Sequence, residues 1–226
     1  CPVKKVVSKG AGAGVLKDID LMVKLTKAVV NSTELPVTVK TRLGWDTESI
    51  NIEEVAERLQ EVGIKALTIH ARTRTQMYKG KADWEYISKV KNNPNIEIPI
   101  FGNGDIDSPE TALEYREKYN IDGMMIGRGA IGYPWIFNEI KHFFQTGEKL
   151  PPPTIKDRLE AVRQHAEWSA EWKGERAGLI EMRQHYSNYF RGIPHFKEYR
   201  TKFLQVLTMQ EMESVLEEIY TQLDKE

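Results

Sequence analysis

Four stretches of the chain have the pattern of a β-strand followed by an amphipathic helix. The strand runs are rich in β-branched and other apolar residues and are bounded by Gly or Pro, as is typical of buried strands. They cover residues 35–45, 65–73, 96–105 and 122–130. Helical patterns follow at residues 50–63 and 83–93, from Ser108 onward, and at residues 135–144. Repeated strand–helix units predict a parallel sheet covered by helices.

The helix boundaries carry their own signals. In residues 50–63, apolar side chains recur on one face and Gly63 is a stop signal. The apolar positions of this face are Ile52, Val55, Ala56, Leu59 and Val62. Ser108 is suited to an N-cap, with Pro109 at the first helical position. We therefore expect at least these two helices to have well-defined starts or ends.

The pattern changes after the proline run 151–153. From Thr154 onward the chain is helical throughout, and Thr154 with Asp157 forms a capping signal. We therefore predict two domains: a partial barrel over residues 1–150 and an all-helical domain over residues 151–226.

Composition narrows the function classes. The chain has 226 residues, 40% of them hydrophobic, with a formal net charge of −1 and a single cysteine. Near-neutral charge argues against binding a polyanion by bulk charge, although a local basic patch is compatible with it. One cysteine cannot form an internal disulfide and suits a reducing compartment. No apolar run reaches the roughly 20 residues needed to span a bilayer. These features predict a soluble cytoplasmic protein.

Polar side chains stand at the carboxyl end of every predicted strand. Lys40 and Arg42 share one face of the first strand because side chains alternate. The following strands end in His70 and Arg72, in Asn103 and Asp105, and in Arg128. Four such units predict half of a (β/α)8 barrel, whose active site lies on the loops after the strands. They would be its C-terminal half if the other four units preceded Cys1. The glycine turn at Gly104, between Asn103 and Asp105, would let main-chain N–H groups approach a phosphate-bearing cofactor. A ring of cationic and amide groups of this kind is suited to an anionic cofactor.

Several motifs, in order, resemble the tRNA dihydrouridine synthase family, most closely its bacterial B-type branch. They are "CPVKKVVSKGAGAGVL", "VTVKTRLGW", "TIHARTRTQMYKGKADW", "IFGNGDI" and "MMIGRGAIGYPWIF". The resemblance continues into the helical region at "MRQHYSNYFRGIP". It implies a flavin mononucleotide (FMN) enzyme that reduces the 5,6 double bond of a uridine in tRNA, with NADPH as the electron source.

The resemblance also implies roles for individual residues. Cys1 matches the family's catalytic acid, and Lys40 matches the lysine beside the flavin. The remaining matches to flavin contacts are His70, Asn103, Gly104, Asp105, Gly127 and Arg128, with the last pair at the phosphate. A cysteine at its ordinary pKa of about 8.5 is mostly protonated at neutral pH, so it can donate the proton that accompanies hydride transfer.

The family's first four strands, its N-terminal flavin loop and a glutamine near the ring have no counterpart in this sequence. Because the chain begins at Cys1 without an initiator Met, we interpret it as the middle of a longer natural chain.

Two alternative functions stay open. One is a flavin barrel acting on a small molecule, such as a dihydroorotate-type dehydrogenase, and the other is an RNA-binding piece without activity.

A half barrel has two open sheet edges and an uncovered apolar face, which predicts a dimer or aggregation.

The helical region carries a local basic cluster. Between Met182 and Phe203 there are five basic residues and one acid, Glu198. The basic residues are Arg183, Arg191, Lys197, Arg200 and Lys202. We expect them, together with Arg42 and Arg72 at the barrel mouth, to contact tRNA phosphates. The aromatic residues interleaved with them are expected mainly in the helical core.

Overall fold

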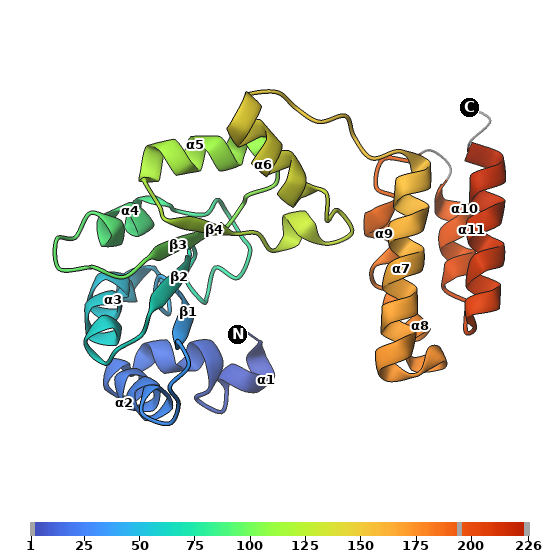
Figure 1. The fold of residues 1–226 in the computed structure, drawn as a ribbon. Coiled ribbons are helices and arrows are strands. Elements are labelled where there is room, and N and C mark those ends of the chain that lie inside the picture. Colours follow the sequence, from blue (N-terminus) through green and yellow to red (C-terminus); the bar gives the residue numbers. More distant parts are fainter. Residues whose placement is uncertain (1–2, 194–195, 224–226) are drawn as a thin grey trace. The chain divides into compact units, whose positions relative to one another are not determined.

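The computed structural model describes residues 3–193 and 196–223. These residues form two compact units, Cys1–Gly129 and Ala130–Glu226, which we describe separately (Figure 1). The first unit holds a sheet with helices, and the described part of the second is helical.

The sheet has four parallel strands that pair in chain order. The strands are β1 (Thr38–Arg42), β2 (Ala66–His70), β3 (Ile100–Asn103) and β4 (Gly123–Met125). Sequential parallel pairing, with a helix in each connection, is the topology of consecutive units in a (β/α)8 barrel. The predicted fold class, part of such a barrel followed by helices, is therefore confirmed.

The strand register aligns the polar strand ends. Arg42 pairs with His70, His70 pairs with Asn103, and Asn103 pairs with Met125. Because side chains alternate between the two faces of a sheet, these four residues lie in one row on the same face. On the opposite face Leu67 and Ile69 are buried. One face therefore carries the apolar core, and the other carries the row of polar groups.

Three helices cover the apolar face in the predicted order (Figure 1). They are α3 (Ile52–Glu61), α4 (Glu85–Lys91) and α5 (Pro109–Tyr119). In α5 the Ser108 side chain accepts a hydrogen bond from the Thr111 N–H, which confirms the predicted cap. Four of the five predicted apolar positions of α3 are buried; Val62 lies just after the helix.

A buried tryptophan links α4 to the sheet. The indole of Trp84, just before α4, lies so close to Gly102 that a Cβ added at Gly102 would be 2.0 Å from the ring. Its Nε1 donates to the carbonyl of Gly104 at 3.0 Å. Trp84 therefore fixes the end of β3 and the turn that follows it.

The N-terminal segment contains helices that the sequence pattern did not predict. They are α1 (Lys4–Val7), the 3₁₀ helix η1 (Gly12–Lys17) and α2 (Ile19–Val30), and Asp18 caps α2 by accepting from the Leu21 N–H. Val7, Ala13 and Leu16 form a small buried cluster. The shortness of α1 and η1 gives a weak periodic signal, which explains why the pattern missed these two, whereas α2 has a regular 12-residue pattern that the sequence analysis did not select.

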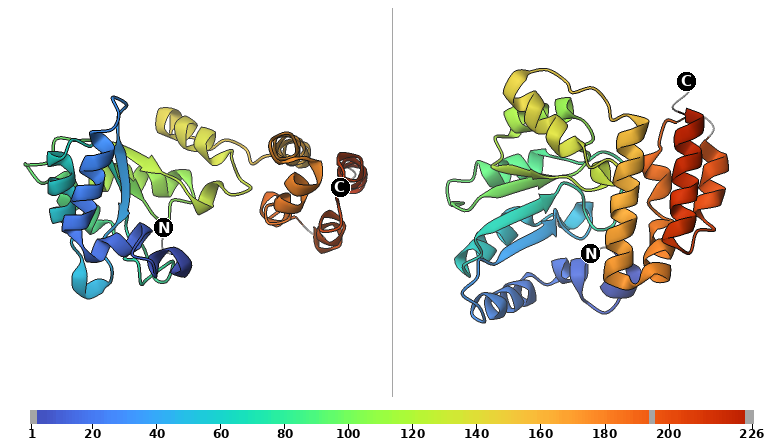
Figure 2. Two further views of the ribbon diagram at one scale, coloured as in Figure 1. Left: turned by 90° about the horizontal axis from the view of Figure 1, so that it is seen from below. Right: turned by 45° about the vertical axis from the view of Figure 1, so that its right-hand side comes forward.

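The described part of the second unit consists of helices, and those from residue 155 onward supply its buried core. Its helices are α6 (Ile136–Thr146), α7 (Ile155–Lys173), α8 (Glu175–Met182), α9 (Tyr186–Tyr189), α10 (Phe196–Phe203) and α11 (Met209–Leu223). Helices α7 and α11 run side by side (Figure 2). The predicted capping box of Thr154 and Asp157 opens α7 and is confirmed.

The compact units divide before the proline run, at Gly129/Ala130. Our boundary at residue 150/151 therefore does not match the division of packing. Trp135 packs against the core of the helical bundle, and the guanidinium of Arg158 lies 5.9 Å from the centre of the Tyr133 ring. These contacts attach the segment before α6 to the helical unit. Among the residues that the structure describes, no helix combines the length and apolar character required to cross a bilayer.

Candidate active site

The carboxyl ends of the strands bring together the residues that the sequence singled out. Arg42, His70 and Asn103 are level with one another in the sheet, and Lys40 lies two residues earlier on the same face of β1. The Asn103 side chain donates from Nδ2 to the Met125 carbonyl at 2.7 Å, which ties the end of β3 to β4. The predicted row of polar side chains therefore exists.

Asp105 is the centre of an ionic network. Its Oδ2 accepts from Arg72 Nη2 at 2.7 Å and from the Ala82 N–H at 2.8 Å, and its Oδ1 accepts from Arg128 Nη2 at 3.1 Å. Burial by itself would raise the pKa of this carboxyl group. The hydrogen bonds from Arg72 and Ala82 and the charges of both arginines outweigh burial, so its pKa is lowered.

The turn between Asn103 and Asp105 needs glycine at its centre. Gly104 has φ +133°, and a Cβ there would lie 2.8 Å from the Ala82 side chain. Asp105 itself adopts φ +56°, a left-handed conformation that Asp tolerates better than most residues. The glycine turn thus lets the Asp105 carboxylate point back to the loop after β2.

That loop, residues 71–83, is held by two buried arginines. Arg42 Nη1 donates to the carbonyls of Thr73 at 2.8 Å and Met77 at 3.0 Å. Arg72 donates to the carbonyls of Lys79 at 3.3 Å and Gly80 at 2.7 Å. The exposed fraction is 6% for Arg42 and 2% for Arg72. We expected both arginines to contact RNA, but their burial and main-chain partners favour a role in holding the loop.

His70 is buried beside a group of cations. Burial lowers its pKa from 6.5 to about 3, and the charges of Arg42, Lys40 and Arg72 act in the same direction, whereas Asp105 opposes them. The imidazole is therefore neutral at physiological pH, with one nitrogen able to donate a hydrogen bond and the other able to accept one.

Lys40 offers a positive charge on the open face of β1. Its side chain retains exposed surface, yet the surrounding protein atoms and then the charge of Arg42 lower its pKa. A lysine with a lowered pKa next to other cations is poised to bind an anion, because an anion relieves the mutual repulsion.

Tyr78 belongs to this site, although sequence reasoning did not select it. Its ring lies 4.5 Å from the Arg128 guanidinium carbon, 5.9 Å from that of Arg42, and 6.3 Å from the centre of the His70 ring. About half of Tyr78 is exposed, at 51%. A tyrosine in a loop carries no periodic signal, but its place inside the motif "TRTQMYKG" was a usable hint.

The end of β4 is open. A Cβ placed on Gly127 would meet no atom within 4 Å, and the Arg128 side chain is 55% exposed while still paired to Asp105. The main chain at Gly127 has no protein atoms crowded against it, and Asp105 orients the Arg128 side chain. An accessible main chain beside an oriented cation is suited to binding an anionic group. The predicted acid Cys1 lies outside the described residues, so its side chain is not placed here.

The predicted RNA contacts of the helical unit have different surroundings. Arg191, Lys197, Arg200 and Lys202 are exposed, and Arg183 is partly buried. Lys202 forms an ion pair with Glu218 of α11. The interleaved aromatic residues are buried in the helical core, as expected: Tyr186, Tyr189, Phe190, Phe196, Tyr199 and Phe203. This leaves α10, with three of the basic residues, as the main candidate surface for RNA.

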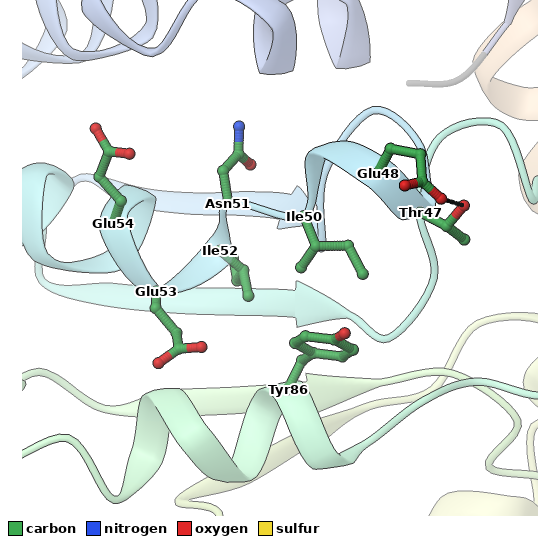
Figure 3. A pocket seen from close by; sticks show the side chains of 8 residues that line it. All are labelled: Thr47, Glu48, Ile50, Asn51, Ile52, Glu53, Glu54 and Tyr86. Carbon is green, nitrogen blue, oxygen red and sulfur yellow. Dashed lines mark hydrogen bonds between the residues drawn. The ribbon is translucent and has the colours of Figure 1, made fainter.

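A separate pocket of about 490 Å³ lies between the loop after β1, the start of α3, and Tyr86 of α4 (Figure 3). It is lined by three carboxylates, from Glu48, Glu53 and Glu54, and by none of the residues placed at the strand ends. Figure 3 shows Glu53 and Glu54 pointing to different sides. The carboxylates therefore do not converge on one ligand position.

Comparison with known proteins identifies the family to which the sequence is similar. The family model "Dihydrouridine synthase (Dus)" matches residues 1–224. The chain is 42% identical over 218 residues to "Probable tRNA-dihydrouridine synthase 1" of Synechocystis sp., covering 96% of this chain and 61% of the relative. It is 40% identical over 203 residues to "tRNA-dihydrouridine synthase B" of Pseudomonas aeruginosa, covering 90% and 60%. The B-type relative of Shewanella oneidensis is 37% identical over 223 residues, covering 99% and 68%.

The chain thus spans about three-fifths of the length of the first two relatives. The match nevertheless extends over nearly all of its own residues, from the segment before β1 to α11. The chain belongs to the dihydrouridine synthase family, and the similarity is to its bacterial B-type members.

Proposed function

We propose that this chain is part of a flavin-dependent enzyme that reduces a uridine in tRNA to dihydrouridine, with NADPH as the electron source. Family membership supports the reaction. The observation that carries the proposal is the meeting of Lys40, His70, Asn103 and the Asp105–Arg128 pair at the carboxyl ends of four adjacent strands. That edge is where (β/α)8 enzymes have their active sites.

The residues present fit FMN. A phosphate needs cations and accessible N–H groups, and the open main chain at Gly127 beside the exposed Arg128 offers both. Arg72 also keeps a buried Nη1 without a hydrogen-bond partner among the described residues, which indicates unused donor capacity next to Asp105. The donor set is cationic and neutral, as an anionic cofactor requires.

Each residue then has a role that its surroundings support. Gly127 and Arg128 hold the phosphate, and Asp105 orients Arg128. Asn103 and the neutral His70 supply hydrogen bonds to polar atoms of the ring system. Lys40 would offer a positive charge to the bound flavin, a charge that favours electron-rich flavin. Bound FMN would supply a hydride to one carbon of the uracil double bond. Arg42 and Arg72 keep loop 71–83, and with it Tyr78, in place at the site.

Cys1 is the proposed proton donor for the other carbon. At its ordinary pKa of about 8.5 a thiol is mostly protonated at neutral pH, so it can act as a general acid. The helical unit is proposed to hold the tRNA through the exposed cations of α10. A uridine of folded tRNA must leave its stack to reach a barrel mouth, so a second surface that holds the RNA backbone is mechanically useful.

The test begins with the purified chain and added FMN. We expect visible flavin absorbance to remain after gel filtration, and Arg128→Ala to weaken FMN binding more than tRNA binding. With unmodified tRNA and NADPH, dihydrouridine should form, and Cys1→Ala should abolish it while leaving FMN binding intact. A Cys1→Ala protein with the wild-type rate would contradict the assigned acid.

Three other results would redirect the proposal. FMN binding without any dihydrouridine would assign uridine reduction to a longer protein of which this chain is one part. NADPH oxidation coupled to a small molecule, with no effect of tRNA, would favour a flavin enzyme outside tRNA modification. Binding of tRNA without FMN would mean that this chain is an RNA-binding piece only.

A further inference from the structure

We propose that Trp45 is a positioning residue that couples the segment Val3–Lys17 to the active-site loop 71–83. The inference rests on the proposed function only where it concerns Cys1, which precedes the segment Val3–Lys17 by two residues. Its structural part stands on contacts within the first unit. Neither the family match nor the similarities described above assign a role to Trp45.

Trp45 lies in the loop after β1, two residues beyond the buried Leu43. The indole packs against the small cluster of Val7, Ala13 and Leu16 from the N-terminal segment. Lys17 lies over the same ring, with Nζ 3.8 Å from its centre. Asn51, from the same loop, also donates from Nδ2 to the Leu16 carbonyl at 3.1 Å. The Trp45 ring and the Asn51 hydrogen bond thus both hold the N-terminal segment to the loop after β1.

Trp45 also contacts the active-site loop. The Arg74 guanidinium carbon lies 4.9 Å from the centre of the ring, and the Trp45 carbonyl accepts from the Thr75 N–H at 2.9 Å. A second main-chain bond joins the Arg74 N–H to the Gly44 carbonyl at 2.9 Å. The indole therefore contacts two cations from different segments, Lys17 and Arg74.

This arrangement differs from ordinary core packing in one respect. The cluster of Val7, Ala13 and Leu16 is small and separate from the helical core, and α1 has only four residues. A short segment with little buried surface opens easily unless specific contacts hold it. Tryptophan is the best aromatic partner for cations, and it can contact a cation and an apolar cluster together. Trp45 is the side chain that does so here.

The consequence concerns the proposed acid. Cys1 precedes Val3 by two residues, so the chain transmits any loosening of Val3–Lys17 to it. Loop 71–83 carries Tyr78 and is fastened to Asp105 through Arg72 and Ala82. Trp45 therefore connects the segment that follows the acid to the loop that lines the proposed flavin site. A proton donor must be correctly positioned as well as have a suitable pKa. We therefore expect the rate of uridine reduction to depend on the contacts of Trp45.

Hydrogen–deuterium exchange on the chain itself tests the structural part without any activity. We expect Trp45→Ala to speed amide exchange in residues 12–17 about tenfold, with protection of α3 and α5 unchanged. Lys17→Gln removes one exposed cation and should give a smaller increase of about two- to fivefold at the same amides. Trp172→Ala changes an exposed tryptophan of α7, 81% exposed, and should have no effect there.

A mobility probe on Cys1 gives a second readout, because it is the single cysteine of the chain. A nitroxide attached there should become more mobile in Trp45→Ala and in Lys17→Gln, and should be unchanged in Trp172→Ala. Should Trp45→Ala fail to fold, Lys17→Gln and Trp45→Phe still decide the question. Unchanged exchange and unchanged probe mobility in these variants would overturn the proposal.

Kinetic measurements separate the catalytic consequence of the Trp45 contacts from their structural role. In the dihydrouridine assay, Trp45→Phe should lower kcat several-fold while leaving the KM for tRNA and the affinity for FMN near their wild-type values. A merely structural defect would lower FMN affinity as well. If the chain forms no dihydrouridine, the proposed function fails for this chain, but the exchange and mobility results still test the role of Trp45 in holding the segment.

Discussion

Arg72 and Asp105 are 33 residues apart in the chain and form an ion pair of 2.7 Å that joins the loop after β2 to the turn after β3. The arginine is almost fully buried, whereas 27% of the Asp105 side chain is exposed. The pair organises the site because the second carboxylate oxygen of Asp105 is left to orient Arg128. It therefore links three of the four strand ends.

Replacing Asp105 tests this link. Asp105→Asn leaves a buried guanidinium without its carboxylate and should lower the free energy of unfolding by about 2–3 kcal/mol, below the roughly 3–5 kcal/mol typical of fully buried pairs. Asp107→Asn, at an exposed position nearby, should change it little. Urea denaturation of the two variants measures the difference.

The lowered pKa of Asp105 predicts that its contribution to the free energy of unfolding depends on pH. Because the folded-state pKa of Asp105 lies below its ordinary value of 3.8, the carboxylate contributes stability above that value. The contribution is lost as the pH falls through the folded-state pKa. The difference between wild type and Asp105→Asn should be constant from about pH 7 to pH 5 and should shrink below about pH 4. A difference that grew on acidification would contradict the assignment.

His70 should remain neutral far below the pH at which an ordinary histidine titrates. With a folded-state pKa of about 3 against 6.5, the unfolded chain binds the proton first, so acidification through this window costs stability. NMR titration of the imidazole should show no protonation above pH 5. Lys40→Gln removes one of the opposing charges and should raise the midpoint, whereas Lys65→Gln, just before β2, should leave it in place.

Two glycine substitutions separate folding from cofactor binding. Gly104→Ala forces a Cβ to 2.8 Å from Ala82 at φ +133° and should destabilise the chain by about 1–3 kcal/mol. Gly127→Ala meets no atom within 4 Å and should leave the melting temperature unchanged. If a phosphate approaches the main chain there, Gly127→Ala nevertheless weakens FMN binding. Calorimetry of both variants measures the melting temperature and the FMN affinity. Unchanged FMN affinity in Gly127→Ala would place the phosphate elsewhere.

The exposed cations of the helical unit should set tRNA affinity. Neutralising Arg191, Lys197 or Arg200 should each lower the slope of log affinity against log salt by about 0.7–0.9, if that residue contacts a phosphate. Lys173→Gln on α7 is the matched control, because Lys173 already pairs with Glu181. Fluorescence anisotropy of labelled tRNA over a salt series measures these slopes. Equal slopes in all variants would leave α10 as an ordinary solvated surface.

Self-association should depend on α2. Leu21, Leu25 and Val29 form an exposed apolar row on this helix, and β1 is an edge strand. Such surfaces promote association. We expect the chain to be dimeric or larger by light scattering, with Leu25→Glu shifting it toward the monomer. Lys24→Glu changes the charge of the same helix without removing apolar surface and should not have that effect. A monodisperse wild-type monomer would contradict the prediction.

The sequence by itself determined the strand–helix order, because hydrophobic periodicity and caps are local. The strands at β1 to β4, the Ser108 cap and the Thr154–Asp157 box follow from residues within a few positions of one another. It also placed Lys40, His70 and Asn103 at strand ends, where parallel pairing had to bring them together. The ordered motifs led to the family.

Tertiary structure decided which polar groups face outward. Arg42 and Arg72 have the same residue type as Arg128, but main-chain carbonyls of loop 71–83 enclose the first two and leave the third open. The attachment of Tyr133 and Trp135 to the helical core, and the contact of Trp45 with Lys17 and Arg74, likewise join residues distant in the chain. Burial and partner choice of this kind arise from packing between segments, which no local pattern in the sequence encodes.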